Sequence, residues 1–183
     1  MQRHFISRSI TIPNKLIIRL CKLNHLPRMF ISMYNIRTVV FREDFMNTQA
    51  LQHLKTYFGY DTFRPGQTQI IESVLNNKDT LVIMPTGGGK SLCYQIPALC
   101  LEGTTLVISP LISLMKDQVD MLTSSGIPAA FINSSLSFDE VQDVMYAVRS
   151  GKIKLLYIAP ERLENERFCM ELAQIKVPLL AID

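Results

Sequence analysis

The sequence lacks the features that mark membrane-spanning, collagen-like and linker-like chains. Its 183 residues contain no uninterrupted run of about eighteen apolar residues, so no membrane-spanning helix is expected. Only eight glycines and nine prolines are present, too few for a collagen-like or linker-like chain. Hydrophobic residues make up 48% and charged residues 19%, which indicates a folded chain of one domain, or one domain with an appendage.

Cysteine pairs at metal-binding or redox spacing are also missing. The four cysteines form no C-x-x-C pair, and no histidine stands near them at the spacing of a metal site. They are Cys21, Cys93, Cys100 and Cys169. This usage predicts reduced thiols in a cytosolic protein rather than a disulfide framework or a zinc site.

Acidic residues are absent from the first 42 positions, which divides the chain into two parts. Residues 1–45 carry eight basic and two acidic residues, whereas residues 46–183 carry eleven basic and fourteen acidic ones. The second part is therefore not a basic nucleic-acid module by composition. Any contact with DNA there has to come from local groups rather than from a broad positive field.

The head of the chain, residues 1–45, has no clear helical or strand periodicity. Three interpretations fit its basic, acid-poor composition: a targeting peptide, a basic arm that contacts phosphates, or an extension outside the working protein. We favour the third, because the segment that opens at Met46 resembles a natural start and a wrongly chosen upstream start would give such an unpatterned stretch. We therefore expect little stable structure before residue 46, and place a partial ATP-binding domain at residues 46–183.

Short apolar runs alternate with amphipathic segments from residue 47 onward. Strands are predicted at residues 80–84, 104–109, 129–132, 154–159 and 177–182. Helices are predicted at residues 47–58, 66–77, 91–97, 111–122, 137–148 and 160–172. The strand runs are continuously apolar, which indicates a sheet covered on both faces. The sequence thus predicts an α/β fold with a mostly parallel open sheet, in which ligands bind beyond the carboxyl ends of the strands.

A glycine-rich loop follows the first predicted strand and opens a helix. It consists of Thr86, Gly87, Gly88, Gly89, Lys90 and Ser91. Glycines let several backbone N–H groups turn toward one phosphate, and the helix start adds its positive dipole end. Lys90 can then reach the outer phosphates of a nucleotide, and the Ser91 hydroxyl can bind Mg²⁺. The loop is a variant, because Met84 stands where the usual pattern has its first glycine.

Asp183 ends the last predicted strand. In a nucleotide-binding sheet, an acid at this point can hold Mg²⁺ through water. The alternative is an aspartate that caps the next turn, just as the glycine-rich loop has the alternative of an ordinary strand-to-helix turn with an exposed lysine.

Several segments resemble motifs of the RecQ family of DNA helicases, in the same order along the chain. These are FGYDTFRPGQ at residues 58–67, MPTGGGKSLCYQIPA at 84–98, SPLISLMKDQ at 109–118 and YIAPERL at 157–163. The last three residues, Ala181, Ile182 and Asp183, resemble the approach to that family's Asp-Glu-Ala-His box. The resemblance covers residues 47–183, looks closest to the bacterial members, and leaves the head outside.

The resemblance implies a P-loop (RecA-like) first motor domain of a DNA helicase, truncated inside the box. It implies ATP and Mg²⁺ as cofactors and 3′-to-5′ unwinding of DNA in recombination and repair. Tyr60 and Arg64 would sandwich the adenine, and Gln67 would read its edge. The loop residues Thr86, Gly87, Gly88, Gly89, Lys90 and Ser91 would hold the phosphates. Lys90 and Asp183 would be the catalytic residues, and Ser91 and Asp183 would hold Mg²⁺.

The same resemblance implies partners and a location. Single-stranded and partly duplex DNA would lie along residues 109–117 and 160–162, where strand-end loops can hold phosphates without reading bases. By composition alone, however, Lys116 and Asp117 fit the solvated face of an amphipathic helix. The resemblance also implies a single-stranded-DNA-binding protein as a partner and no membrane. The implied location is the bacterial cytoplasm, in association with the nucleoid.

Other parts of such a helicase lie outside these 183 residues. They are the glutamate that follows the aspartate of the box, the second motor domain with its arginine finger, the zinc-binding region and the DNA-reading winged helix. Phosphoryl transfer depends on a complete set of positioned charges. We therefore expect this chain to bind ATP and Mg²⁺ but not to unwind DNA alone.

Two other functions compete with this interpretation. An RNA helicase of the related DEAD-box type would read near Pro-Thr-Arg-Glu-Leu where this chain has residues 109–113, SPLIS, which argues against it. A nucleotide-binding module without enzymatic activity is the second competitor.

Overall fold

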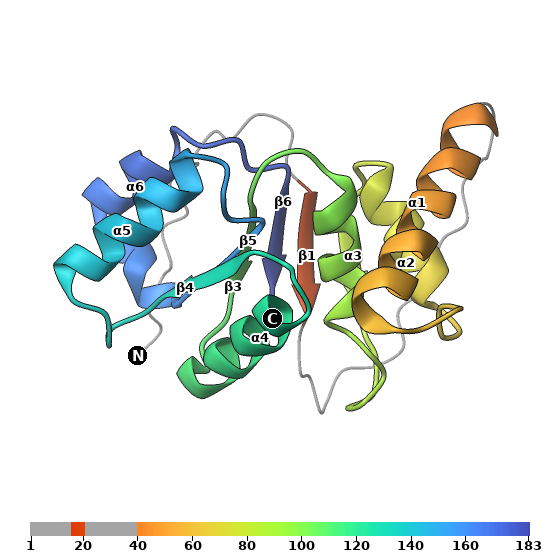
Figure 1. Cartoon of the computed structure of the whole chain (residues 1–183), viewed down its shortest axis with the longest axis horizontal. Coiled ribbons are helices and arrows are strands. Elements are labelled where there is room, and N and C mark those ends of the chain that lie inside the picture. Colours follow the sequence, from red (N-terminus) through yellow and green to blue (C-terminus); the bar gives the residue numbers. More distant parts are fainter. Residues whose placement is uncertain (1–15, 21–39) are drawn as a thin grey trace, which may run out of the picture.

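The computed structural model describes residues 16–20 and 40–183, with side chains described from residue 48 onward. Six strands form one sheet, whose order is β2-β1-β6-β3-β5-β4, and every neighbouring pair is parallel (Figure 1). The strands are β1 (Leu16–Leu20), β2 (Thr80–Val82), β3 (Thr105–Ile108), β4 (Ala129–Ile132), β5 (Leu155–Ile158) and β6 (Leu179–Ile182). The α/β fold with a mostly parallel open sheet is therefore confirmed.

Helices cover the sheet on both faces, as the continuously apolar strands predict. The helices are α1 (Val40–Phe58), α2 (Gln67–Leu75), α3 (Leu92–Cys100), α4 (Ile112–Ser124), α5 (Phe138–Arg149), the 3₁₀ helix η1 (Pro160–Glu164) and α6 (Glu166–Leu172). Val107 of β3 packs in one core with residues of α3 and α4. Leu106 and Ile108 of the same strand pack on the other side with residues of α5 and α6. The alternation follows from the strand geometry, which turns successive side chains to opposite faces.

Helices α1 and α2 lie on the outside of α3 (Figure 1). Leu54 of α1, Ile71 of α2 and Ile96 of α3 are buried together in a third apolar cluster. This packing fixes α3, and with it the glycine-rich loop at its start, between the sheet and the two outer helices.

The structure differs from the expectation of little regular structure before residue 46. Strand β1 lies inside the sheet between β2 and β6, and α1 begins at Val40 rather than near Asn47. Residues 16–20 read LIIRL, four apolar residues and one arginine. Such a short run has no periodicity of its own, so a buried parallel strand cannot be recognised from it without its neighbours. The other residues of the head lie outside the described part.

Two proline positions also differ from expectation. Helix α3 continues through Pro97 to Cys100, and the N–H of Leu101 still donates to the Pro97 carbonyl at 3.0 Å. The predicted helix 160–172 is divided in two, because Pro160 opens the 3₁₀ turn η1 and Asn165 then takes an extended backbone conformation. The Asn165 side chain accepts a hydrogen bond from the N–H of Phe168 at 3.0 Å, which caps α6.

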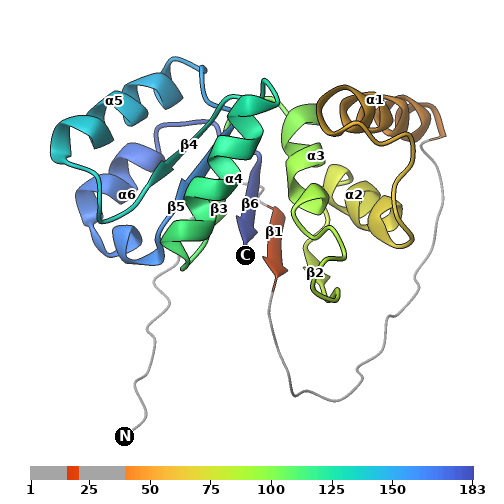
Figure 2. The same ribbon diagram turned by 60° about the horizontal axis from the view of Figure 1, so that its bottom comes forward.

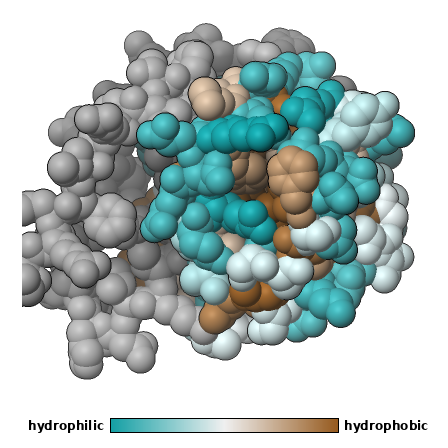
Figure 3. Space-filling model, turned by 90° about the vertical axis from the view of Figure 1, so that its left-hand side faces the viewer, coloured by the Kyte–Doolittle hydropathy of each residue, from teal (hydrophilic) through white to brown (hydrophobic). Residues whose placement is uncertain are grey.

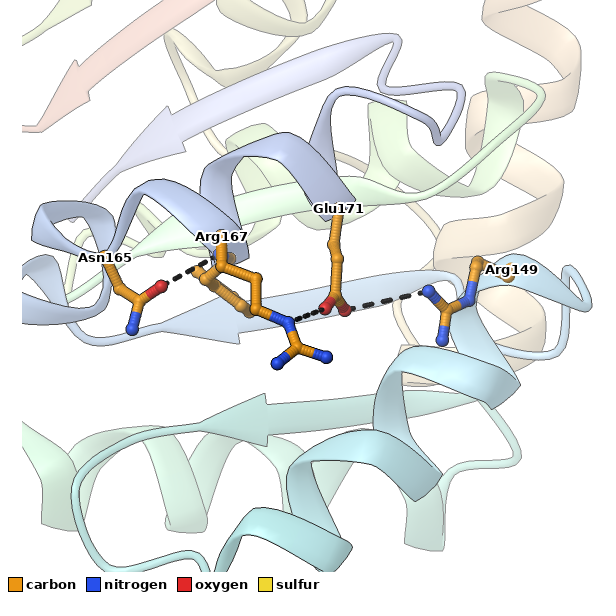
Figure 4. A network of polar contacts seen from close by, with 5 residues as sticks. Arg149, Asn165, Arg167 and Glu171 are labelled. Carbon is orange, nitrogen blue, oxygen red and sulfur yellow. Dashed lines mark hydrogen bonds and ion pairs between the residues drawn. The ribbon is translucent and has the colours of Figure 1, made fainter.

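Charged side chains join α6 to the neighbouring helix α5 (Figure 4). Glu171 of α6 lies 3.6 Å from Arg167, one turn earlier, and 3.6 Å from Arg149 of α5. The surface over these two helices is largely hydrophilic, with single apolar side chains among the polar ones (Figure 3). In the part of the chain with described coordinates, no helix is long and apolar enough to cross a membrane.

Because all strands run the same way, their carboxyl ends meet at one edge of the sheet. The glycine-rich loop follows β2 there, Ser109 follows β3, Asn133 follows β4, η1 follows β5 and Asp183 follows β6. Figure 2 shows the carboxyl terminus at this edge, beside the ends of the central strands. The fold therefore gathers polar residues that are far apart in the sequence along one rim.

Candidate nucleotide-binding site

The glycine-rich loop between β2 and α3 has the backbone that its sequence predicts. Gly87 and Gly89 have φ values of 79° and 80°, in the left-handed region that residues with a side chain rarely adopt. The N–H of Gly88 donates to the Pro85 carbonyl at 3.0 Å and closes the turn. Thr86 is exposed at the tip of this loop. The loop thus curves tightly before the helix starts.

Lys90 and Ser91 stand at the start of α3. The ammonium of Lys90 donates to the carbonyls of Met84 at 3.3 Å and Pro85 at 3.2 Å, so this side chain reaches back across the loop. The Ser91 carbonyl accepts hydrogen bonds from the N–H groups of Tyr94 at 3.2 Å and Gln95 at 2.9 Å. Ser91 is thus the N-cap residue of the helix, directly after the loop.

Arg64, which precedes α2, and Gln67, the first residue of α2, contact the loop directly. The guanidinium of Arg64 donates to the Gly87 carbonyl at 2.7 Å. The amide nitrogen of Gln67 donates to the carbonyl of Gly89 at 3.1 Å, and its amide oxygen accepts from the N–H of Arg64 at 2.8 Å. A Cβ atom added to Gly89 would lie 2.5 Å from that amide nitrogen. The structure therefore brings two of the three residues expected at the adenine to the loop itself.

Tyr60, the third residue expected at the adenine, lies on the loop after α1 with 51% of its surface exposed. An exposed tyrosine ring is free to stack on a base, although the described side chains of Arg64 and Gln67 are engaged with the loop. The assignment of all three residues to adenine binding stays a prediction.

Asp183 lies at the end of β6, where its N–H donates to the Ile108 carbonyl at 2.9 Å. Its carboxylate is close enough to Tyr94 of α3 and Tyr157 of β5 to raise their pKa values. Burial is the larger cause in both cases, and it raises the pKa of Tyr94 well above the ordinary value. A hydrogen bond with the Ser91 side chain acts on Tyr94 in the opposite direction. Tyr94 thus has Ser91 and Asp183 as neighbours.

These neighbours fit a nucleotide with a divalent metal. Ser91 and Asp183 supply a hydroxyl and a carboxylate, both oxygen ligands of the kind that Mg²⁺ prefers. Among the residues from 48 onward, no three His, Cys, Asp or Glu side chains gather as a metal site. A Mg²⁺ ion at this rim would therefore complete its shell with water and phosphate oxygens, as is usual for this ion.

Two further residues of the rim were expected to contact DNA. Ser109 is buried, and its hydroxyl meets no hydrogen-bond partner within the described part of the chain. The guanidinium of Arg162 donates to the Asn133 carbonyl through Nε at 3.2 Å and also through Nη2. Leu111 and Ile112, in the same expected track, are exposed.

Sequence reasoning missed the residues that support the rim. Asn133 is buried after β4 and holds Arg162, and its own side-chain oxygen accepts from the N–H of Ser135 at 2.9 Å. Its position directly after a short apolar run was a usable signal, because polar residues at strand ends line the ligand edge of such sheets. The buried Tyr94 and Tyr157 gave no such signal, because a tyrosine within an apolar run reads as a packing residue.

The sequence of this chain is similar to those of known helicases, in line with a nucleotide site at the glycine-rich loop. The DEAD/DEAH box helicase family matches residues 64–183. The ATP-dependent DNA helicase RecQ of Pasteurella multocida is 52% identical over 153 residues, which are 84% of this chain and 24% of that protein. The RecQ proteins of Haemophilus influenzae and Bacillus subtilis are 54% and 56% identical, over 73% and 74% of this chain and 22% and 23% of their own lengths.

The chain spans about a quarter of the length of these relatives. The family match includes the phosphate loop, the rim residues after β3, β4 and β5, and Asp183. The motif resemblance to RecQ helicases is confirmed by these identities. The chain therefore belongs to the DEAD/DEAH box helicase family, in which its similar relatives are RecQ helicases.

Proposed function

We propose that this chain is the nucleotide-binding part of the first motor domain of a RecQ-type ATP-dependent DNA helicase. The observation that carries the proposal is the glycine-rich loop at the rim, with Lys90 and Ser91 following it and Asp183 ending a nearby strand. Loop amides and a helix start at the carboxyl edge of a parallel sheet are suited to bind phosphates. The whole protein's unwinding activity is part of this proposal, because the chain covers about a quarter of its relatives.

The residues of the loop divide the work on ATP. Thr86, Gly87, Gly88 and Gly89 hold phosphate oxygens, and the N–H of Gly88 has to exchange the Pro85 carbonyl for phosphate to take part. Lys90 leaves the carbonyls of Met84 and Pro85 and turns its ammonium to the outer phosphates, where it offsets charge that develops during transfer.

Ser91 and Asp183 hold Mg²⁺ against the phosphates, directly or through water. When bound, the ion would neutralise part of the charge of the phosphates. Lys90 and Asp183 are thus the residues of this chain closest to the chemistry.

Tyr60 and Arg64 stack on the two faces of the adenine, and Gln67 pairs with its edge. Arg64 and Gln67 bond to loop carbonyls in the described structure, so binding of the base requires them to exchange these partners. A ring face, a guanidinium plane and a carboxamide are chemically suited to these three tasks.

DNA contacts follow from the same rim. Single-stranded and partly duplex DNA lies along Ser109 to Asp117 and Pro160 to Arg162, held mainly through its phosphates. From the resemblance to RecQ helicases we also propose 3′-to-5′ movement and a role in recombination and repair. A single-stranded-DNA-binding protein as partner, a place at the nucleoid and a zinc site elsewhere in the whole protein belong to the same proposal.

ATP binding by the 183-residue chain tests the proposal. Calorimetric titration with ATP and Mg²⁺ should show binding, and Lys90→Ala should abolish it. Lys152→Ala is the matched control, because Lys152 precedes β5 at the opposite edge of the sheet and is exposed. Absence of ATP binding by the unaltered chain, with its fold intact by circular dichroism, would refute the nucleotide site.

Strand displacement tests the activity. The whole protein should unwind a partly duplex DNA with a 3′ single-stranded tail, in the presence of ATP, and should not unwind one with a 5′ tail. For residues 1–183 alone we propose ATP and Mg²⁺ binding without unwinding. A whole protein that binds ATP but never unwinds or hydrolyses it would favour a nucleotide-binding module instead.

A further inference from the structure

A polar chain of three buried side chains and the half-buried Gln118 lies behind the phosphate loop, between α3, β5 and α4. Tyr94 and Gln95 belong to α3, Tyr157 to β5 and Gln118 to α4. Tyr94, Gln95 and Tyr157 have 0%, 1% and 1% of their surfaces exposed. Buried polar groups cost free energy unless they are hydrogen-bonded, so their pairing here is informative.

Each pair of neighbouring side chains in this polar chain lies within hydrogen-bond distance. The amide nitrogen of Gln95 donates to the side-chain oxygen of Gln118 at 2.8 Å and to the hydroxyl of Tyr157 at 3.3 Å. The hydroxyls of Tyr157 and Tyr94 lie 3.3 Å apart, and their rings meet edge to face. The polar chain therefore joins three elements of the fold through one continuous set of hydrogen bonds.

The direction of one of these bonds is fixed by its atoms. An amide nitrogen only donates, so the Tyr157 oxygen accepts from Gln95, and either tyrosine hydroxyl can donate to the other. The Ser91 side chain lies close enough to Tyr94 to lower the pKa of the Tyr94 hydroxyl, against the larger effect of burial, which raises it.

The backbone ties the same residues together. The N–H groups of Tyr94 and Gln95 both donate to the Ser91 carbonyl, at 3.2 Å and 2.9 Å. Ser91 is thus held through its carbonyl by the backbone of these two residues, and its side chain lies beside that of Tyr94. A shift of Tyr157 or Gln118 would reach Ser91 by both routes.

We propose that Tyr157 and Gln118 are positioning residues that orient the Ser91 hydroxyl for the metal of bound nucleotide and tie it to helix α4. The inference rests on the proposed function, because it concerns the same nucleotide site. Helix α4 begins at Ile112, inside the segment proposed to contact DNA, so the polar chain connects that segment with the metal position.

Tyr157→Phe tests the proposal, because it removes one hydroxyl and keeps the ring. ATP binding to the 183-residue chain is measured by calorimetry over a series of free Mg²⁺ concentrations and in EDTA. We expect the Mg²⁺ concentration needed for half-maximal enhancement to rise about five- to tenfold, the effect of one lost buried hydrogen bond. ATP binding in EDTA should stay unchanged. Tyr146→Phe, on the exposed face of α5, is the matched control and should change neither value.

Substitution of Gln118 tests the same row of hydrogen bonds with less risk to folding, because this side chain is half-exposed. Gln118→Leu removes the acceptor for Gln95 and should shift the Mg²⁺ dependence in the same direction, whereas Gln118→Glu keeps an acceptor and should restore it. Hydrogen exchange at the N–H groups of Tyr94 and Gln95 should quicken in Gln118→Leu without any nucleotide.

The outcomes separate this inference from the function on which it rests. An unchanged Mg²⁺ dependence in both Tyr157→Phe and Gln118→Leu overturns the positioning role, while normal ATP binding by the unaltered chain leaves the nucleotide site standing. An equal loss of binding with Mg²⁺ and in EDTA also overturns it, because that is the result of general damage. Failure of the unaltered chain to bind ATP refutes the nucleotide site and this inference together.

Discussion

Gly89→Ala is the substitution for which the structure gives the sharpest expectation. Gly89 has φ +80°, and a Cβ atom there would lie 2.5 Å from the amide nitrogen of Gln67. That nitrogen is not at the end of a freely moving side chain. Gln67 is buried, and both ends of its carboxamide are hydrogen-bonded. The substitution therefore imposes a strained backbone and also displaces Gln67.

The two costs can be estimated separately. Holding an alanine in the left-handed region costs about 1 to 2 kcal/mol of unfolding free energy. Loss of the Gln67 hydrogen bond to Gly89 adds about 1 kcal/mol. Gly126→Ala isolates the first cost, because Gly126 has φ +84° and a Cβ there would meet no atom within 4 Å. Gly89→Ala should therefore lower the unfolding free energy by about 1 kcal/mol more than Gly126→Ala does.

Urea unfolding followed by circular dichroism measures both variants. The double variant Gln67→Ala with Gly89→Ala completes the cycle, because removal of the carboxamide also removes the clash. In that background the added cost of Gly89→Ala should fall to that of Gly126→Ala. Equal destabilisation by Gly89→Ala and Gly126→Ala in the presence of Gln67 would refute the close contact on which this reasoning depends.

Three further predictions concern other parts of the molecule. Burial raises the pKa of Cys93 from 9.0 to about 11. The contribution of Cys93 to stability is therefore complete below pH 9 and is lost as the pH rises toward 11. The difference in unfolding free energy between the unaltered chain and Cys93→Ala, measured by urea unfolding at a series of pH values, should follow that course. Ser137→Ala removes the hydroxyl that accepts from the N–H of Glu140 in the capping box of α5, and should lower the unfolding free energy measured in urea by about 1 kcal/mol. The same change at Ser134, outside the helix, should not lower it. Glu171→Gln weakens the ion pair of Glu171 with Arg149 of α5 and the one with Arg167 of α6, and should cost about 1 kcal/mol at low salt; a loss that stays the same in concentrated salt would show that the ion pairs are not its cause.

The part of the fold with strong local signals could be predicted from the sequence. Strands β3, β4, β5 and β6 are continuous apolar runs bounded by breakers, and Ser137 with Glu140 announced the start of α5. Helix α4 was clear from its apolar spacing. These signals are local, so they survive without knowledge of the tertiary structure.

The parts that could not be predicted depend on contacts between distant residues. Strand β1 is stabilised by pairing with β2 and β6, and nothing in the run LIIRL announces those neighbours. Pro97 was expected to kink or end α3, yet the helix continues to Cys100 because its residues are buried against α1 and α2. The extent of each helix is decided by such packing as much as by local propensity.

The candidate site divides in the same way. The sequence indicated Lys90, Ser91 and the three glycines, because the chemistry of phosphate binding needs these residue types in this order. It could not indicate that Arg64 and Gln67 bond to the loop carbonyls, or that Tyr94 and Tyr157 share a hydrogen bond behind it. Both arrangements depend on side-chain distances between elements that only the folded structure sets.

The position of β1 bears on how the molecule is assembled. In the described sheet, β1 joins the strand before the phosphate loop to the strand that precedes Asp183, and both of these partners lie far from β1 in the sequence. Pairings between such remote segments close large loops and form slowly during folding. We therefore expect the two sides of the nucleotide rim to come into register after the local helices and the β3–β5–β4 ladder have formed. Only the completely folded chain would consequently bind nucleotide, and a partly folded intermediate would not bind ATP.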